Sequence, residues 1–257
     1  MLIALSTLLA KGRRAHQPVF ICDTGTIEIA QAVLQVAEKE NRGIALQIDS
    51  TSIQTLPIAT LLDIYTHLAE PLSVPVSIIL HLNPSLANLG FINHPGLTTI
   101  GFKWGSESIV QRKDLVRQVV IVARQSSKEV IGELTQSLTP LKISTFVQET
   151  GIHSLTLGIT QSPTHKDSSF SLAYLRDLSS AAKVPLISPE VFYTPAQLRH
   201  AHEAGLQGFV LKEYLQEAYT AGIRTGLHSH SVINPSHYQL RGMKAVEHSL
   251  AQLLNHY

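Results

Sequence analysis

The sequence lacks the cysteines, the excess charge and the long apolar runs that mark several protein classes. Cys22 is the only cysteine, so an internal disulfide is impossible and a cytoplasmic location is expected. Lys and Arg total 20 against 19 acidic residues, and the scatter of these charges argues against nucleic acid and membrane surfaces as partners. No apolar run reaches the ~20 residues of a spanning helix. The opening MLIALSTLLAKGRR places apolar before basic residues, the reverse of a secretory signal.

Short apolar or β-branched runs occur at intervals along the whole chain. Hydrophobic residues make up 44% of the 257 residues, enough for one large core, and we expect a single domain over 1–257. The runs predict strands at 18–22, 44–48, 74–82, 98–102, 129–134, 154–160, 184–187 and 207–211.

Amphipathic segments lie between these runs. In 28–40, Ile29, Val33 and Val36 fall on one helical face, and 114–125 has a similar pattern. Thr194 followed by Pro195 is typical of a helix start, here over 194–204. Strands that are apolar throughout and are each followed by a helix indicate a parallel sheet, and eight such units predict a (β/α)8 TIM barrel.

Functional residues of such barrels lie where the strands end, at the C-terminal face. At these places the sequence has Cys22, Asp23, Asp49, His81, Asn83, Pro84, Lys103, Trp104, Glu133, Gln161, Ile187, Ser188, Lys212 and Glu213.

Several stretches carry a family resemblance. EIAQAVLQVAEKENRGIALQIDS (28–50), VPVSIILHLNPS (74–85) and INPSHYQLRGMKAVEHSLAQLL (233–254) resemble, in order and spacing, class II fructose-bisphosphate and tagatose-bisphosphate aldolases. FVQETGIHSLTLGI and AQLRHAHEAGLQGFVLKEYLQEAY are similar to later barrel units. The resemblance runs along nearly the whole chain and implies a TIM barrel with an extra C-terminal helix over 240–255.

The residues that carry zinc chemistry in that family are replaced here. Its third strand ends in His-x-Asp-His-Gly, and this chain has Asn83 at the acid/base position and Pro84 at the first zinc position. The other two zinc histidines correspond to Gln161 and Ile187. An amide does not exchange protons as a carboxylate does, and proline and isoleucine have no donor atom for a metal. We therefore expect no cofactor.

The family's phosphate cradle and mobile loop are also altered. SPEV (188–191) replaces a glycine-rich phosphate-binding turn, and Glu213 would repel a phosphate where the family has an Asn-containing motif. The segment between GEL and FVQETG is too short for the loop that brings a catalytic glutamate over the substrate.

Each remaining candidate has a structural interpretation beside its functional one. His81 corresponds to a residue near the family's site, so it is a candidate for substrate binding together with Ser188, although a hydrogen-bonded core histidine is the simpler role. Asp49 and Glu133 predict a carboxylate pair at the barrel mouth, or two solvated acids. His200 and His202 are expected to be solvated, as are His228 and His230, because neither pair has the i, i+4 spacing of a helical metal site.

Three functions are consistent with these residues. The first, which we adopt, is an aldolase-like barrel without catalysis that acts in binding or assembly, as a homodimer or paired with an active aldolase. The second is a re-purposed barrel enzyme using Asp49, Glu133 and a lysine such as Lys212, or His165. The third is an active zinc aldolase with displaced ligands.

Overall fold

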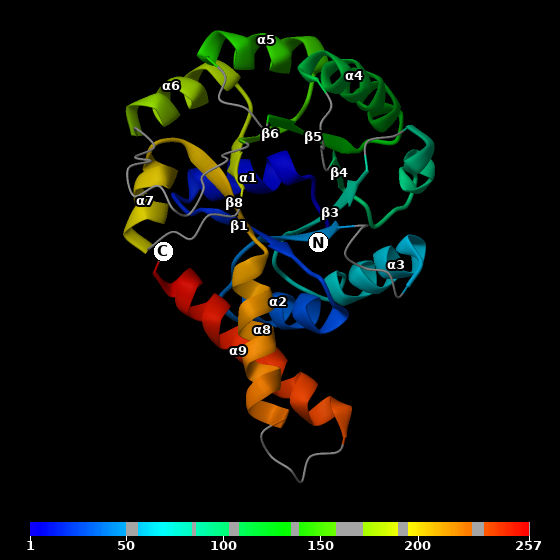
Figure 1. Ribbon diagram of the computed structural model, residues 1–257, viewed down its shortest axis with the longest axis vertical. Helices are drawn as coiled ribbons and strands as arrows, with labels where there is room; N and C mark the ends of the chain where they lie inside the picture. The colour runs from blue at the N-terminus through cyan, green and yellow to red at the C-terminus, as the bar shows by residue number, and fades with distance from the viewer. Residues whose placement is uncertain are drawn as a thin grey trace.

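In the computed structural model, the strands form a closed parallel barrel in the order β1 to β8, with β8 beside β1 (Figure 1). The structure describes residues 1–49, 56–83, 86–102, 108–134, 139–157, 172–189, 195–227 and 234–256, with 86–88 and 109 described in their backbone only.

Each predicted strand is present, and its bounds agree with the prediction to within two residues wherever the chain is described. The strands are β1 Val19–Asp23, β2 Ile44–Asp49, β3 Val76–Leu82, β4 Thr99–Phe102, β5 Glu129–Leu134, β6 Ser154–Leu157, β7 Leu186–Ser188 and β8 Leu206–Leu211. Residues 158–160, predicted to continue the sixth strand, lie outside the described ranges.

Helices follow the strands and cover the outside of the barrel. They are α2 Ile27–Lys39, α3 Ile58–Ala69, α4 Ile109–Gln125, α5 Pro140–Thr150, α6 Leu172–Ala182, α7 Pro195–Glu203, α8 Glu213–Leu227 and α9 Pro235–Asn255, with a 3-10 turn η1 over Leu86–Phe91. α9 packs on α8 and α2, and the α8–α9 hairpin projects from the barrel (Figure 1). Within the described ranges, no helix has an apolar stretch long enough to cross a bilayer.

Two helices begin earlier than the apolar pattern predicts because polar residues cap them. α4 begins at Ile109, not 114, since the Ser108 hydroxyl accepts from the backbone N–H of Gln111 at 3.3 Å, while the Gln111 side chain accepts from the Ser108 N–H at 2.9 Å. α9 begins at Pro235, not 240, since the Asn234 side chain accepts from the N–H of Ser236 at 3.1 Å. Capping extends both helices into polar sequence.

A further helix, α1 Leu5–Arg14, precedes the first strand and was not predicted. Its buried residues Leu5, Leu8 and Leu9 form one cluster with barrel side chains that include Ile79 and Ile187. Glu129, the first residue of β5, accepts hydrogen bonds from the backbone and hydroxyl of Ser6, in the first turn of α1. α1 therefore closes the N-terminal end of the barrel with apolar side chains.

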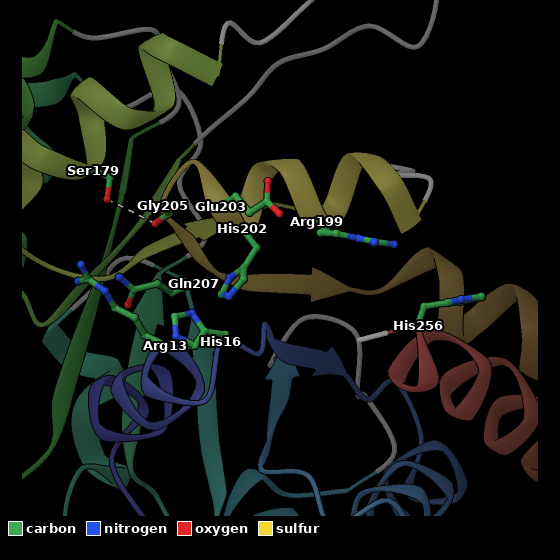
Figure 2. A pocket seen from close by; sticks show the side chains of 9 residues that line it. All are labelled: Arg13, His16, Ser179, Arg199, His202, Glu203, Gly205, Gln207 and His256. Atoms are coloured by element: carbon green, nitrogen blue, oxygen red, sulfur yellow. Dashed lines mark hydrogen bonds between the residues drawn. The ribbon is translucent and has the colours of Figure 1, made fainter.

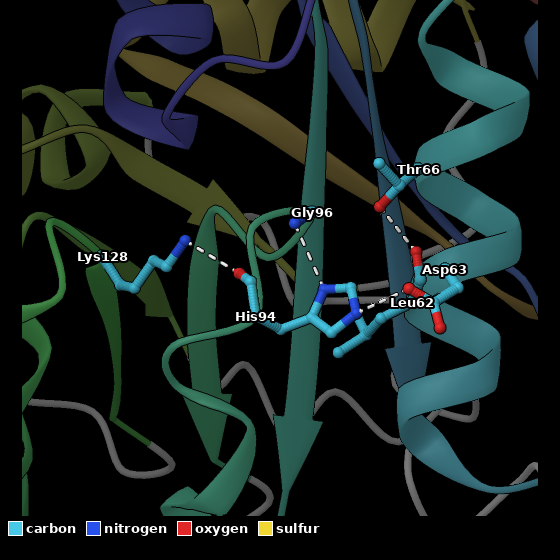
Figure 3. Close-up of polar contacts among 6 residues, drawn as sticks. All are labelled: Leu62, Asp63, Thr66, His94, Gly96 and Lys128. Atoms are coloured by element: carbon cyan, nitrogen blue, oxygen red, sulfur yellow. Dashed lines mark hydrogen bonds and ion pairs between the residues drawn. The ribbon is translucent and has the colours of Figure 1, made fainter.

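A polar network fixes the connection that leads into β4 (Figure 3). The ring of His94 accepts from the N–H of Gly96 at its Nδ1 (3.2 Å), so its Nε2 is the donor to the Asp63 carboxylate of α3 at 3.0 Å. The ammonium of Lys128 donates to the carbonyls of His94 and Leu97 at 3.0 and 2.6 Å. These bonds tie the connection to both α3 and the start of β5.

Candidate functional site at the barrel mouth

Side-chain alternation decides which residues point into the barrel. Ile21, Ala45 and Ile79 belong to the interior cluster around α1. Residues two or four positions further along a strand lie on the same face, so Asp23, Gln47 and Asp49, and His81 point into the barrel nearer its C-terminal end. Glu133 stands in the same relation to Ile131 of the interior cluster. The predicted candidates of the first half of the barrel thus share its interior face.

An ion-pair cluster lies at the ends of β1, β2 and β8. The ammonium of Lys212 lies 3.6 Å from Asp49 Oδ2 and 3.8 Å from Asp23 Oδ2. Gln47 Nε2 donates to Asp23 Oδ2 at 3.2 Å. Both carboxylates are buried, with exposed fractions of 1% for Asp23 and 5% for Asp49. Lys212, which follows β8, places one positive charge beside two buried negative charges, and buried charges are normally paired in this way.

The backbone around this cluster is held by neutral hydrogen bonds. The hydroxyl of Thr24 donates to the Gln47 carbonyl at 3.0 Å, and the buried Tyr65 hydroxyl of α3 donates to the Thr24 carbonyl at 3.1 Å. Burial raises the pKa of Tyr65 to about 12 and raises the pKa of the Cys22 thiol. Both side chains therefore stay protonated near neutral pH and act as structural groups rather than as bases or nucleophiles.

Glu133 has a different environment from Asp49. Burial raises its pKa to about 7, against the opposing influence of the Arg112 guanidinium. Arg112, near the start of α4, is itself buried. A carboxyl that titrates near neutrality can exchange protons at physiological pH. Asp49 has the Lys212 ammonium beside it at 3.6 Å, and a carboxylate pair between Asp49 and Glu133 stays a prediction.

His81 is half-buried at the end of β3, where it is the register neighbour of Asp49 on β2 and of Gly101 on β4. Its ring occupies the space that a Cβ at Gly101 would need, so the glycine is required by this close approach. The ring therefore lies across the barrel face of β4.

Ser188 and Ile187 end β7 on opposite faces. Ile187 is fully buried in the interior cluster around α1. Ser188 is also fully buried, and its hydroxyl donates to the carbonyl of Pro189 at 2.9 Å. Ile187, which the sequence predicted to take the place of a zinc ligand, is thus an apolar core residue.

Asn83 is exposed just after β3. The other candidates from the sequence lie outside the described residues, namely Pro84, Lys103, Trp104, Gln161, His165, His228 and His230. One expectation about the remaining histidines is wrong. His200 is exposed as predicted, but His202 is half-buried, and its Nδ1–H donates to the Leu206 carbonyl oxygen at the start of β8 at 2.8 Å.

The described residues do not fit a zinc site. Zinc in catalytic sites takes three protein ligands of N, O or S type and keeps one open position. Among the residues that the structure describes, no three His, Cys, Asp or Glu side chains gather closely enough to hold a metal ion. The two interior carboxylates of β1 and β2 have an ammonium beside them, which is itself a cation.

Comparison with known proteins gives matches in structure only. No protein-family model and no curated protein matches the sequence. The crystal structure of the YdjI aldolase from Escherichia coli K12 superimposes with a TM-score of 0.90 at 15% identity, covering 100% of this chain and 97% of that one. The fold is an aldolase-type (β/α)8 barrel. A fructose-bisphosphate aldolase from Campylobacter jejuni is similar with a TM-score of 0.82 at 12% identity, covering 99% and 95% of the two chains.

The sequence pattern missed two members of the ion-pair cluster of this aldolase-type barrel. The strand-end rule places Asp23 at the end of a strand without assigning it a role, and it does not single out Gln47. A signal for both was present, because Gln47 and Asp49 are polar at alternate positions of the otherwise apolar strand IALQID. Polar residues at period two in a buried strand indicate an interior polar layer.

Proposed function

We propose that this protein is a class II aldolase-like barrel that does not carry out zinc-dependent aldol cleavage and instead binds a small polar molecule at its mouth. The observation that carries this proposal is the Lys212 ammonium between the carboxylates of Asp23 and Asp49. A metal ion bound by these carboxylates would lie close to that ammonium and be repelled by it.

The same cluster supports binding. Carboxylates accept hydrogen bonds and an ammonium donates them, so a hydroxylated ligand can contact both kinds of group at the mouth. The Lys212 side chain is 34% exposed, whereas the two acids beside it are buried. Small-molecule sites commonly consist of an apolar wall with a few such polar groups, here on strand ends held by the barrel.

The test measures zinc content and aldol cleavage on the same preparation. The purified protein is dialysed against zinc and then against metal-free buffer, its bound zinc is determined by elemental analysis, and cleavage of fructose 1,6-bisphosphate is followed with the Campylobacter jejuni aldolase as positive control. We expect far less than one zinc per chain and no cleavage above the buffer rate. Stoichiometric zinc together with turnover would overturn the proposal.

We also propose that the protein self-associates through the α8–α9 hairpin. Leu227 and Leu240 are 54% and 47% exposed, and both lie near the end of the hairpin where Gly226 of α8 packs on Tyr238 of α9. Light scattering coupled to size exclusion should give a dimer mass for the native chain and a monomer mass for Leu240→Gln. A monomeric native chain would contradict this assembly.

A further inference from the structure

A cavity with a volume of about 570 Å³ lies at the opposite end of the barrel from the mouth (Figure 2). Its walls come from the segments that lead into strands: His16 precedes β1, Ser179 lies in the last turns of α6 before β7, and Gly205 and Gln207 lie at the start of β8. The volume is within the ~300–1,000 Å³ of small-molecule sites. The barrel mouth shares none of these residues.

The lining carries a net positive charge. Its charged and titratable side chains are Arg13, His16, Arg199, His202, Glu203 and His256. With neutral histidines these groups sum to one positive charge, from two arginines and one glutamate, and every histidine that gains a proton adds another. None of the ion pairs among the described residues involves Arg13 or Arg199. The cavity is therefore suited to an anion.

Gln207 provides a second line of evidence for a ligand, and this evidence does not depend on charge. It is a buried polar residue, with an exposed fraction of 7%, and it lines the cavity. Its side-chain amide makes no hydrogen bond to any other residue in the described part of the chain. The amide atoms are not among the fully buried polar atoms that lack a hydrogen-bond partner, so the amide is open to the cavity. An anion in the cavity would accept a hydrogen bond from its N–H group.

His16 and His202 face each other beside Gln207 and Arg13 (Figure 2). His16 ends the turn after α1 with φ +53°, a conformation that usually selects glycine or asparagine. Nδ1 of His202 lies 2.8 Å from the Leu206 carbonyl oxygen, so Nδ1 carries the proton and Nε2 is left for another partner. Both rings are thus placed by the backbone around them.

Gly205 shapes the wall between α7 and β8. Its φ of +113° is open to glycine only, and a Cβ there would collide with Ser179 of α6. The Ser179 hydroxyl donates to the Gly205 carbonyl at 3.5 Å. This close approach brings α6 and the α7–β8 turn together, so the packing of the backbone forms this wall of the cavity.

We propose that this cavity binds the phosphoryl group of a small phosphorylated molecule, with Arg13, Gln207 and the rings of His16 and His202 as donors. Guanidinium groups match the geometry of phosphate oxygens, and imidazolium and amide N–H groups complete a donor set for a dianion. The volume exceeds that of one phosphate, so it leaves room for an attached organic group. This inference concerns the N-terminal end of the barrel and stands apart from the function proposed for the mouth.

The affinity should depend on pH through the two facing histidines. Burial, and also the nearby His16, lower the pKa of His202, whereas its bond to Leu206 and the Glu203 carboxylate act in the opposite direction. Arg13, Arg199 and His256 are the other charged or titratable groups lining the cavity. A bound dianion favours the protonated rings, so it binds more tightly at low pH, by about tenfold for each histidine whose pKa it raises by one unit.

The first experiment is calorimetric titration of the whole protein at low ionic strength with inorganic phosphate and, separately, with glucose 6-phosphate. We expect saturable binding, and Arg13→Gln should weaken it by about tenfold or more, the loss of a charge-assisted hydrogen bond. Arg14→Gln is the matched control, because Arg14 is in the same last turn of α1 but does not line the cavity. Tighter binding of the sugar phosphate identifies an esterified ligand, and equal binding identifies free phosphate. Equal weakening by the two variants, or no saturation, would overturn the proposal.

The second experiment measures pH dependence with sulfate, which keeps its double charge over the range used. Sulfate affinity should fall between pH 6 and pH 8 in the native chain and fall less in His16→Asn, where asparagine tolerates the positive φ. His200→Asn is the control, since His200 is exposed on α7 outside the cavity lining. A sulfate affinity that does not change with pH would show that the histidines do not contact the anion.

Discussion

Replacing Lys212 with methionine removes the ammonium that lies 3.6 Å from Asp49 and 3.8 Å from Asp23 while keeping an unbranched side chain of similar length. At an effective dielectric constant of ~20, each of these contacts is worth about 4–5 kcal/mol before screening by solvent. Because the Lys212 side chain is 34% exposed, much of that energy is screened, and desolvation offsets more. The variant leaves two buried acids without this cation. We expect a net loss of roughly 2–4 kcal/mol of folding free energy.

Thermal unfolding followed by circular dichroism measures this loss, and the Tm of Lys212→Met should fall by roughly 5–15 °C for a chain of this size. Lys142→Met, at an exposed position of α5, is the matched control and should change the Tm by less than about 1 °C. Adding Asp49→Asn to Lys212→Met should recover part of the loss, because it removes one of the uncompensated charges. If Lys212→Met has the same Tm as the native protein, the cluster is not a stabilising ion pair and the reasoning is wrong.

Three further predictions follow from the fold and the mouth. The raised pKa of Glu133, about 7 in the folded state against 4.5 for the free side chain, means that the native state holds its proton more tightly. Stability from this group is fully present below pH 4.5 and is lost as pH rises through 7, by up to about 3 kcal/mol. Denaturant titrations should show that loss in the native chain and not in Glu133→Gln, and parallel pH profiles would contradict it. Leu9→Ala, in the fully buried face of α1, should cost about 2–5 kcal/mol in the same assay, whereas Lys11→Ala, exposed on the same helix, should cost less than about 0.5 kcal/mol. Gly101→Ala should displace the His81 ring and shift its imidazole NMR signals, and unchanged signals would show that the ring does not lie against Gly101.

The strands could be predicted because short apolar runs mark them in the local sequence. Runs such as 18–22 and 184–187 are apolar throughout, as both faces of a barrel strand are covered. The first helix was missed for a different reason. Leu5, Leu8 and Leu9 have helical spacing, but an apolar segment that starts a chain resembles part of a targeting signal, and only the closed barrel provides the interior that they fill.

The candidate site was predicted in its positions but not in its partners. The rule that strand ends carry function placed Asp49, Glu133 and Lys212 at the mouth, and all three lie there. Which charges pair depends on the neighbours in a closed barrel, where β8 lies beside β1 and brings Lys212 to Asp23. Such contacts join residues nearly 190 positions apart, and no local pattern encodes them.

Strand β8 spans the barrel between its two ends, with Gln207 near its first residue and Lys212 just beyond its last. The two residues are five positions apart along the chain, about 17 Å at ~3.3 Å per residue. Because apolar side chains of α1 fill the barrel axis, the strands connect the two ends of the barrel and solvent does not. A shift of β8 along β1 would have to break four parallel register pairs, from Val19 with Gly208 to Cys22 with Leu211. The two ends of the molecule can therefore change independently, by mutation or by ligand, within one fold.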